Sequence, residues 1–375
     1  MAHFSPSEPP ASSSTPRKNN PHHLHFATQA VLFTTIAVAA IMLWPTGSTT
    51  TRNTAYSNML AKKWGKHITT ALIREKQREL TPNDETCKAL FLDYMNSKAR
   101  QMGMPHTRFA DASGYVKGQS TITPLDAITL ITTAHRCADI SEAWGKTTYE
   151  MHVKGPHERT DTIGTGRRAA VTDYYQLLGG KTGTLAGCHN AVFICRNADG
   201  ITFVAAIINS SWEQRWPDLK KLIDIASRRF KDQHADVSDI SMVATGAFVT
   251  PYPMSPLYRR ARHFPALFSL EPATRHYPAS VTKVMTALCM MEWIDNLDRY
   301  LCIKSSDLMP GSGPKFFDGD SITYRDALHA MLLPSSNTAA VALSRTIGQQ
   351  MATQSEAVRA LLNEGLCLLK PADRK

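Results

Sequence analysis

The chain has 375 residues, of which 43% are hydrophobic and 20% charged, so it can bury a full apolar core and is not globally disordered. Its 42 Lys and Arg residues against 32 Asp and Glu residues give a net charge of +10. This positive charge is compatible with nucleic acid, a membrane surface or an anionic polymer as partner, and it does not choose among them.

The N-terminal region contains two different segments. Residues 1–25 are rich in Ser, Pro, Asn and His and lack periodicity, which predicts a disordered tail. The run from Phe26 to Trp44 carries no charge, and at about 1.5 Å per residue it nearly spans a bilayer core of about 30 Å. We therefore expect residues 26–45 to form a membrane anchor, with a cleaved signal segment and a buried core helix as alternatives. Either an anchor or a signal would export everything that follows.

Residues 54–230 mix helical and strand patterns. Apolar positions at three- and four-residue spacing predict a helix over 86–103, ended by Gly103. A second helix is expected over 124–135, with Thr123 as its N-cap. The remaining elements predicted here are a hairpin of two half-buried strands, 191–195 and 202–208, with its turn at 197–200, and a helix over 219–230.

Residues 231–241 are polar and are predicted to link residues 54–230 to residues 242–375. A helix should begin near Ser280, and Pro334 should stop another one. The predicted elements in this part are strands over 242–250 and 266–270 and helices over 281–294, 324–333 and 338–369, the last of them broken near Gly348.

Neither cysteine nor histidine spacing predicts a metal site. The seven cysteines contain no C-x-x-C pair and are expected to be buried thiols, although export would allow one or two disulfides. His22, His23 and His25 lie in the polar tail, where composition alone accounts for them.

The sequence Ser280-Val281-Thr282-Lys283 is an S-x-x-K at the start of a predicted helix. The helix N-terminus favours negative charge developing on the serine, and the lysine lies one turn later on the same face. A desolvated lysine can lose its proton and activate the serine as a nucleophile. About one such match is expected by chance in a chain of this length, so the motif is weak alone.

Two further motifs accompany it. Ser335-Ser336-Asn337 is an S-x-N that could equally be an ordinary helix cap. Lys181-Thr182-Gly183 enters the predicted hairpin and should lie on an edge strand, where the glycine allows close approach to the backbone. Lys181 and Thr182 could hold a carboxylate by charge and by a hydroxyl hydrogen bond.

Together the three motifs match the set found in penicillin-binding proteins and serine β-lactamases. The chain resembles the D-alanyl-D-alanine carboxypeptidases over roughly residues 85–230 and 242–370. The segments that carry the resemblance are Tyr277–Thr286, Met331–Ala340, Met95–Phe109 and Gly180–Gly187.

The resemblance implies a serine D,D-carboxypeptidase acting on peptidoglycan stem peptides that end in D-Ala-D-Ala, without a metal or cofactor. Ser280 would be the nucleophile, Lys283 its base, and Ser335 the relay of a proton to the leaving D-alanine. Asn337 would hold the peptide amide and Lys283. Lys181 and Thr182 would bind the terminal carboxylate, Gly183 would also belong to the substrate-binding site, and the oxyanion hole would be the backbone N–H groups of Ser280 and Thr184.

The order of the motifs departs from that family, because Lys181 here precedes Ser280. We interpret the chain as a circular permutant whose two halves, 54–230 and 242–375, build one catalytic domain. The expected fold is α/β of the α+β type: an antiparallel sheet flanked by helices, with a helical lobe and the active site between them. The helix after Ser280 should pack against strands 191–195 and 202–208.

Two other functions remain open from the sequence. One is an inactive homologue that binds peptidoglycan or a partner, and the other is a β-lactamase, for which we find no carboxylate suited to activating the deacylating water. The expected partners are stem peptides, β-lactams as covalent inhibitors and the membrane, but no nucleic acid. The expected location is the extracytoplasmic, periplasmic side of a bacterial envelope.

Overall fold

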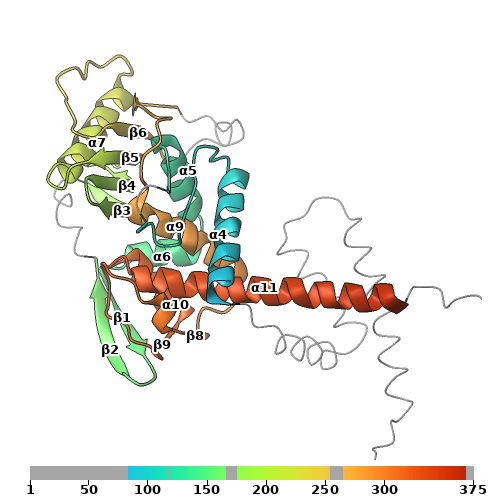
Figure 1. The fold of residues 1–375 in the computed structure, drawn as a ribbon. Coiled ribbons are helices and arrows are strands. Elements are labelled where there is room, and N and C mark those ends of the chain that lie inside the picture. The colour runs from blue at the N-terminus through green and yellow to red at the C-terminus, as the bar shows by residue number, and fades with distance from the viewer. Residues whose placement is uncertain (1–82, 117–118, 166–174, 254–264, 369–375) are drawn as a thin grey trace, which may run out of the picture. The chain divides into compact units, whose positions relative to one another are not determined.

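The computed structural model describes residues 83–116, 119–165, 175–253 and 265–368 (Figure 1). The chain divides into two compact units, residues 77–354 and residues 1–76 with 355–375. The sheets and the candidate site all belong to the first unit. No helix within the described ranges is long and apolar enough to cross a membrane. The predicted tail 1–25 and anchor 26–45 lie outside the described residues.

A five-stranded antiparallel sheet is the centre of this unit, in the order β3-β4-β5-β6-β7. β5 and β6 are hydrogen-bonded neighbours although the polar segment 231–241 separates them in sequence. Both halves of the chain therefore contribute to one sheet, and β3 is an edge strand. The strands are β3 (Gln176–Leu185), β4 (Cys188–Arg196), β5 (Thr202–Ser210), β6 (Gly246–Pro251) and β7 (Phe268–Leu270).

Helices cover both faces of the sheet (Figure 1). α7 (Arg215–Lys231) packs on one face, against residues such as Ala205 and Ile207, and α5 (Pro124–Ala134) packs on the other, against Val204 and Ala206. The hairpin of β4 and β5 is therefore confirmed, but its strands are buried on both faces rather than half-buried. Their nearly continuous apolar sequence reflects this double coverage.

The helical lobe contains the helix that follows Ser280. This helix, α9 (Thr282–Trp293), is buried as predicted. Its main neighbours are other helices rather than β4 and β5, although its side chains share one hydrophobic core with Val192, Ile194 and Val204 of these strands. The other helices of the lobe are α4 (Asp84–Gln101), α6 (Ala138–Gly145), α10 (Tyr324–Leu332) and α11 (Asn337–Leu368).

The predicted break near Gly348 is also wrong, because α11 is continuous through this position. A Cβ atom placed on Gly348 would lie 1.8 Å from the backbone oxygen of Cys87 in α4. The glycine therefore permits two helices to approach closely instead of ending one. The predicted fold class, an antiparallel sheet flanked by helices, is confirmed.

Four short strands form two small antiparallel pairs that the sequence did not predict. They are β1 (Thr148–Val153) with β2 (Arg159–Gly164), and β8 (Tyr300–Cys302) with β9 (Ser321–Thr323). The backbone of Lys154 is bridged to that of Ser321, which ties the first pair to the second.

Candidate active site

Ser280 lies in a single 3-10 turn, η2 (Ala279–Val281), that leads directly into α9. The preceding Ala279 has a φ of 49°, a left-handed conformation that costs free energy in residues other than glycine. The turn is held by Asn190 of β4, whose Nδ2 donates to the backbone oxygens of Tyr277 at 2.8 Å and Pro278 at 3.1 Å. Strained backbone of this kind concentrates at functional sites.

Lys283 is completely buried and lies beside Ser280. Its Nζ is 3.0 Å from Ser280 Oγ, 2.6 Å from Asn337 Oδ1 and 2.8 Å from the backbone oxygen of Ser113. Lysine is almost never fully buried in proteins unless its nitrogen is well paired. The S-x-x-K spacing thus places an amine against the serine hydroxyl, as one helical turn requires.

Lys181 is a second buried lysine, with 2% of its surface exposed. Its Nζ donates to Ser335 Oγ at 2.9 Å and to the backbone oxygen of Thr182 at 3.2 Å. Ser335 itself has a φ of 72°, again left-handed for a residue with a side chain. The K-T-G and S-x-N segments therefore meet through a hydrogen bond between residues 154 positions apart.

The S-x-N segment is both a helix cap and a part of the site. Ser336 Oγ accepts from the backbone N–H of Ala339 at 3.2 Å and caps the first turn of α11. Asn337 uses its oxygen for Lys283, and its Nδ2 donates to the backbone oxygen of Pro310 at 2.7 Å. Ser336, the middle residue of the motif, thus provides the cap. The side chains of Ser335 and Asn337 contact the two buried lysines instead.

A cavity joins the three motifs. Its empty volume, which includes open solvent, is about 460 Å³. Residues of both halves of the chain therefore line one cleft. The lining residues are Gly114, Tyr115, Thr182, Thr184, Leu185, Ser280, Gly311, Ser312, Ser335 and Asn337.

Gly183 fits tightly against the serine turn. A Cβ at this position would lie 2.5 Å from the Pro278 oxygen and 3.1 Å from Ala279 Cβ. A glycine is needed at this position because β3 approaches the turn that carries Ser280 too closely for a side chain. Thr184, the next residue, is exposed at the mouth of the cleft.

Arg215 is a residue of this region that the sequence reading missed. Its Nη1 donates to Thr184 Oγ1 at 2.9 Å, and its guanidinium carbon lies 5.3 Å and 5.4 Å from the ring centroids of Trp212 and Trp216. Burial, and secondarily the charge of Arg215, lower the pKa of nearby His189, so this imidazole is neutral at neutral pH. No spacing in the sequence singles out Arg215, and its contact with Thr184 of β3 depends on the tertiary structure.

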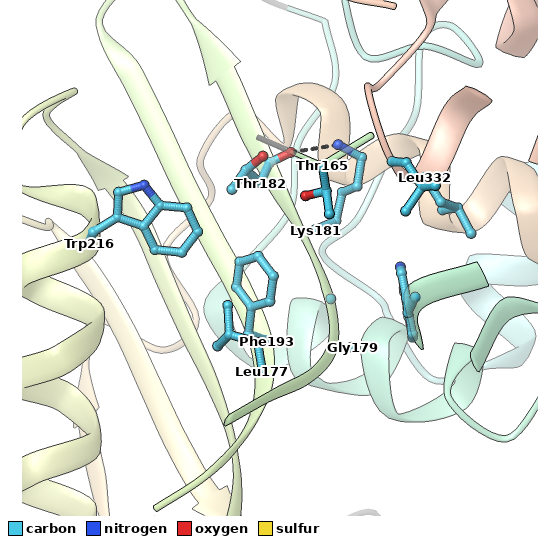
Figure 2. Close-up of a pocket in the computed structure, with 11 residues that line it drawn as sticks. Thr165, Leu177, Gly179, Lys181, Thr182, Phe193, Trp216 and Leu332 are labelled. Atoms are coloured by element: carbon cyan, nitrogen blue, oxygen red, sulfur yellow. Dashed lines mark hydrogen bonds between the residues drawn. The ribbon is translucent and has the colours of Figure 1, made fainter. Parts of the chain in front are cut away.

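A second cavity, with both polar and apolar walls, is also lined by Lys181 (Figure 2). Its empty volume is about 450 Å³, and its walls include Phe193 and Trp216 beside β3 and Leu332 across from them. Lys181 and Thr182 line both cavities. Figure 2 shows the Lys181 ammonium directed toward the Thr182 carbonyl, between these walls.

Among the described residues, no three His, Cys, Asp or Glu side chains are grouped so that they could hold a metal ion. Six cysteines are free thiols: Cys87, Cys137, Cys188, Cys195, Cys289 and Cys302. Four of them are buried, Cys87, Cys188, Cys195 and Cys289, and Cys302 is exposed.

Comparison with known proteins adds one finding. Residues 260–361 match the model of a beta-lactamase enzyme family, Beta-lactamase2. The matched segment contains Ser280, Lys283, Ser335 and Asn337, whereas Lys181 lies outside it. The chain matches no curated protein and no solved structure. The family match supports the serine β-lactamase-like superfamily, which includes serine hydrolases and penicillin-binding proteins.

Proposed function

We propose that the protein is a serine D,D-carboxypeptidase that removes the terminal D-alanine from peptidoglycan stem peptides and is acylated by penicillins. The observation that carries this proposal is the fully buried Lys283, whose Nζ lies 3.0 Å from Ser280 Oγ at the wall of an open cleft. A nucleophile and a base within hydrogen-bond reach, with the base oriented by further groups, are the parts that acyl transfer needs.

In the first step, neutral Lys283 takes the proton of the Ser280 hydroxyl as the serine oxygen bonds to the carbonyl carbon of the penultimate D-alanine. The developing oxyanion is bound by the backbone N–H groups of Ser280 and Thr184. Collapse of the tetrahedral intermediate breaks the peptide bond and leaves an acyl-enzyme. Water then attacks the ester and releases the shortened peptide, and Ser280 regains its proton.

The second motif supplies the proton for the leaving group. Ser335 Oγ lies on the same cleft and accepts from Lys181 at 2.9 Å, so its hydroxyl proton is directed away from the ammonium. In our mechanism this proton passes to the departing D-alanine nitrogen, and the proton that Lys283 took from Ser280 restores the Ser335 hydroxyl, so Ser335 acts as a relay. Lys181 and Thr182 bind the carboxylate of the same D-alanine. The group that recognises the charged end of the substrate therefore lies beside the scissile bond.

The lining of the cleft favours a carboxypeptidase over a β-lactamase. In class A β-lactamases a glutamate carboxylate activates the deacylating water. No Asp or Glu is among the described residues that line the cavity with Ser280. We therefore expect the penicilloyl-enzyme to be long-lived, as suits an inhibitor.

The simplest test separates an enzyme from an inactive homologue. The purified protein is incubated with a peptide ending in D-Ala-D-Ala, with and without prior exposure to a penicillin. Release of D-alanine that the penicillin blocks would support the proposal. Binding of the peptide without release would identify an inactive homologue instead.

Lys181→Ala should mainly weaken the capture of substrates with a free terminal carboxylate. A charged hydrogen bond is worth about 1.5–3 kcal/mol, so kcat/KM should fall about ten- to two-hundred-fold. A matching peptide amide lacks the charge, so the wild type should process it poorly and the substitution should change its turnover little. Lys220→Ala, on the outer face of α7, is the matched lysine control. Equal slowing of both peptides by Lys181→Ala would assign the lysine a different role.

We also propose that the chain is a circular permutant of the carboxypeptidase arrangement. Its support is that β5, before the segment 231–241, pairs with β6, after it, and that both halves line one cleft. Chain order then matters little to the site, because sheet pairing brings the motifs together. Exchange of halves between two copies of the chain is compatible with the same contacts.

The cellular location remains a proposal based on the sequence. We propose that residues 26–45 anchor the protein in the cytoplasmic membrane with the catalytic unit on the extracytoplasmic side. The uncharged run from Phe26 to Trp44 supports this placement. Deleting residues 26–45 should move the protein from the membrane fraction to the soluble fraction. Retention in the membrane fraction after the deletion would contradict the anchor.

A further inference from the structure

The loop before residue 117 supplies one of the oxygens around Lys283. The Ser113 carbonyl accepts from Lys283 Nζ at 2.8 Å, and the Ala112 carbonyl accepts from Thr286 Oγ1 at 2.6 Å. Lys283 and Thr286 are one turn apart on α9, so two successive carbonyls of the loop lie along the face of this helix. The position of the loop therefore sets the direction of one hydrogen bond of the lysine.

The same loop packs against the turn that carries Ser280. Gly114 has a φ of 73°, and a Cβ on it would lie 1.9 Å from the Ala279 oxygen. Ser113 is fully buried. A shift of this loop would consequently alter the surroundings of both the serine and the lysine.

One carboxylate organises this loop. Asp111 Oδ1 accepts from the backbone N–H groups of Ser113 and Gly114, each at 2.7 Å, and from Ser113 Oγ at 2.6 Å. Its Oδ2 accepts from the N–H of Val116 at 3.2 Å. Hydrogen bonds to an ionised acceptor are stronger than neutral ones, and here several converge on one side chain. The turn from 111 to 116 is thus fixed by Asp111.

We propose that Asp111 is a positioning residue for the general base, acting through the Ser113 carbonyl. A neutral amine has two N–H bonds and one lone pair. When the Ser113 carbonyl and Asn337 Oδ1 accept the two N–H bonds, the lone pair of Lys283 is directed at the Ser280 hydroxyl. The O–H bond of the serine then breaks as a third N–H bond forms. This inference rests on the proposed role of Lys283 as the base.

The test compares three variants by the time course of labelling with a fluorescent penicillin at increasing concentrations. Asp111→Ala should lower the limiting first-order acylation rate constant about ten- to hundredfold, since small misplacements of reacting groups have effects of this size. The half-saturating penicillin concentration and the final labelled fraction should stay near the wild-type values. Asp111→Asn should recover most of the rate, because its amide oxygen can still accept from the N–H groups of Ser113 and Gly114.

Asp236→Ala is the matched control, because Asp236 also accepts from a backbone N–H two residues on, that of Ser238, but on an exposed segment away from the site. It should label like the wild type. If Asp111→Ala lowers only the final labelled fraction and leaves the limiting acylation rate constant unchanged, Asp111 has a purely structural role and the proposal is overturned. Equal rate constants for the wild type and Asp111→Ala would overturn it too.

A fluorophosphonate probe separates this proposal from the proposed function, because it reports an activated serine without requiring recognition of a penicillin. If it labels Ser280 while penicillin does not, the carboxypeptidase proposal fails, and the same three variants are compared by their phosphonylation rates. A wild type that neither reagent labels at Ser280 overturns the positioning role as well, since that role requires an activated serine.

Discussion

Ser280→Ala should abolish covalent labelling by a fluorescent penicillin and leave the melting temperature nearly unchanged. The substitution removes the only atom that forms the ester in our mechanism, whereas the buried surroundings of the turn remain in place. The measurement is the mass of the penicillin adduct on the intact protein, followed by mapping of the labelled peptide.

Ser312→Ala is the matched control, because Ser312 lines the same cavity. This variant should still carry the adduct on Ser280. An adduct that persists in Ser280→Ala on another serine would remove Ser280 from its proposed role while leaving the superfamily match unaffected.

Lys283→Ala should slow acylation by about two to four orders of magnitude, the usual contribution of a positioned general base. The variant also leaves the Ser113 carbonyl and Asn337 Oδ1 without their buried donor, so some loss of stability is expected as well. Lys283→Met fills more of the same space without a base and separates the two effects. Rate constants are compared at a temperature where both variants are folded by circular dichroism.

Lys98→Ala provides a lysine control, because Lys98 is paired with Glu292 on the outside of α4 and α9. It should acylate at the wild-type rate. A loss of only a few-fold in Lys283→Met would show that a different group accepts the serine proton.

The sequence was informative wherever the signal was local. The helices α4 and α5 were found because their apolar spacing is a local signal, and Thr123 does accept the backbone hydrogen bond expected of an N-cap. The cap of α4, Asn83, was not predicted. The S-x-x-K geometry is local in the same sense, because one helical turn fixes Lys283 beside Ser280. Elements with weak local signals were missed, such as the short pair β1 and β2, whose exposed residues are largely polar.

The amino-acid composition of a helix did not predict which elements pack against it. Gly348 was interpreted as a helix break since glycine is a poor helix former, yet the structure uses it for the contact of α11 with α4. Likewise, α9 is apolar on most sides, which indicates burial but not whether helices or strands cover it. In both cases the deciding partner is a segment distant in sequence.

The sequence by itself thus determined the turn that places Lys283 beside Ser280, most helices and the strands of the central hairpin. All of these depend on residues close together in the chain. Only the tertiary structure decided that Lys181 meets Ser335, that Asn190 holds the turn before Ser280, and that the Ser113 carbonyl faces Lys283. These contacts depend on sheet register and on the approach of distant backbones. The physical reason is that each is a hydrogen bond between groups whose separation in sequence carries no information about their separation in space.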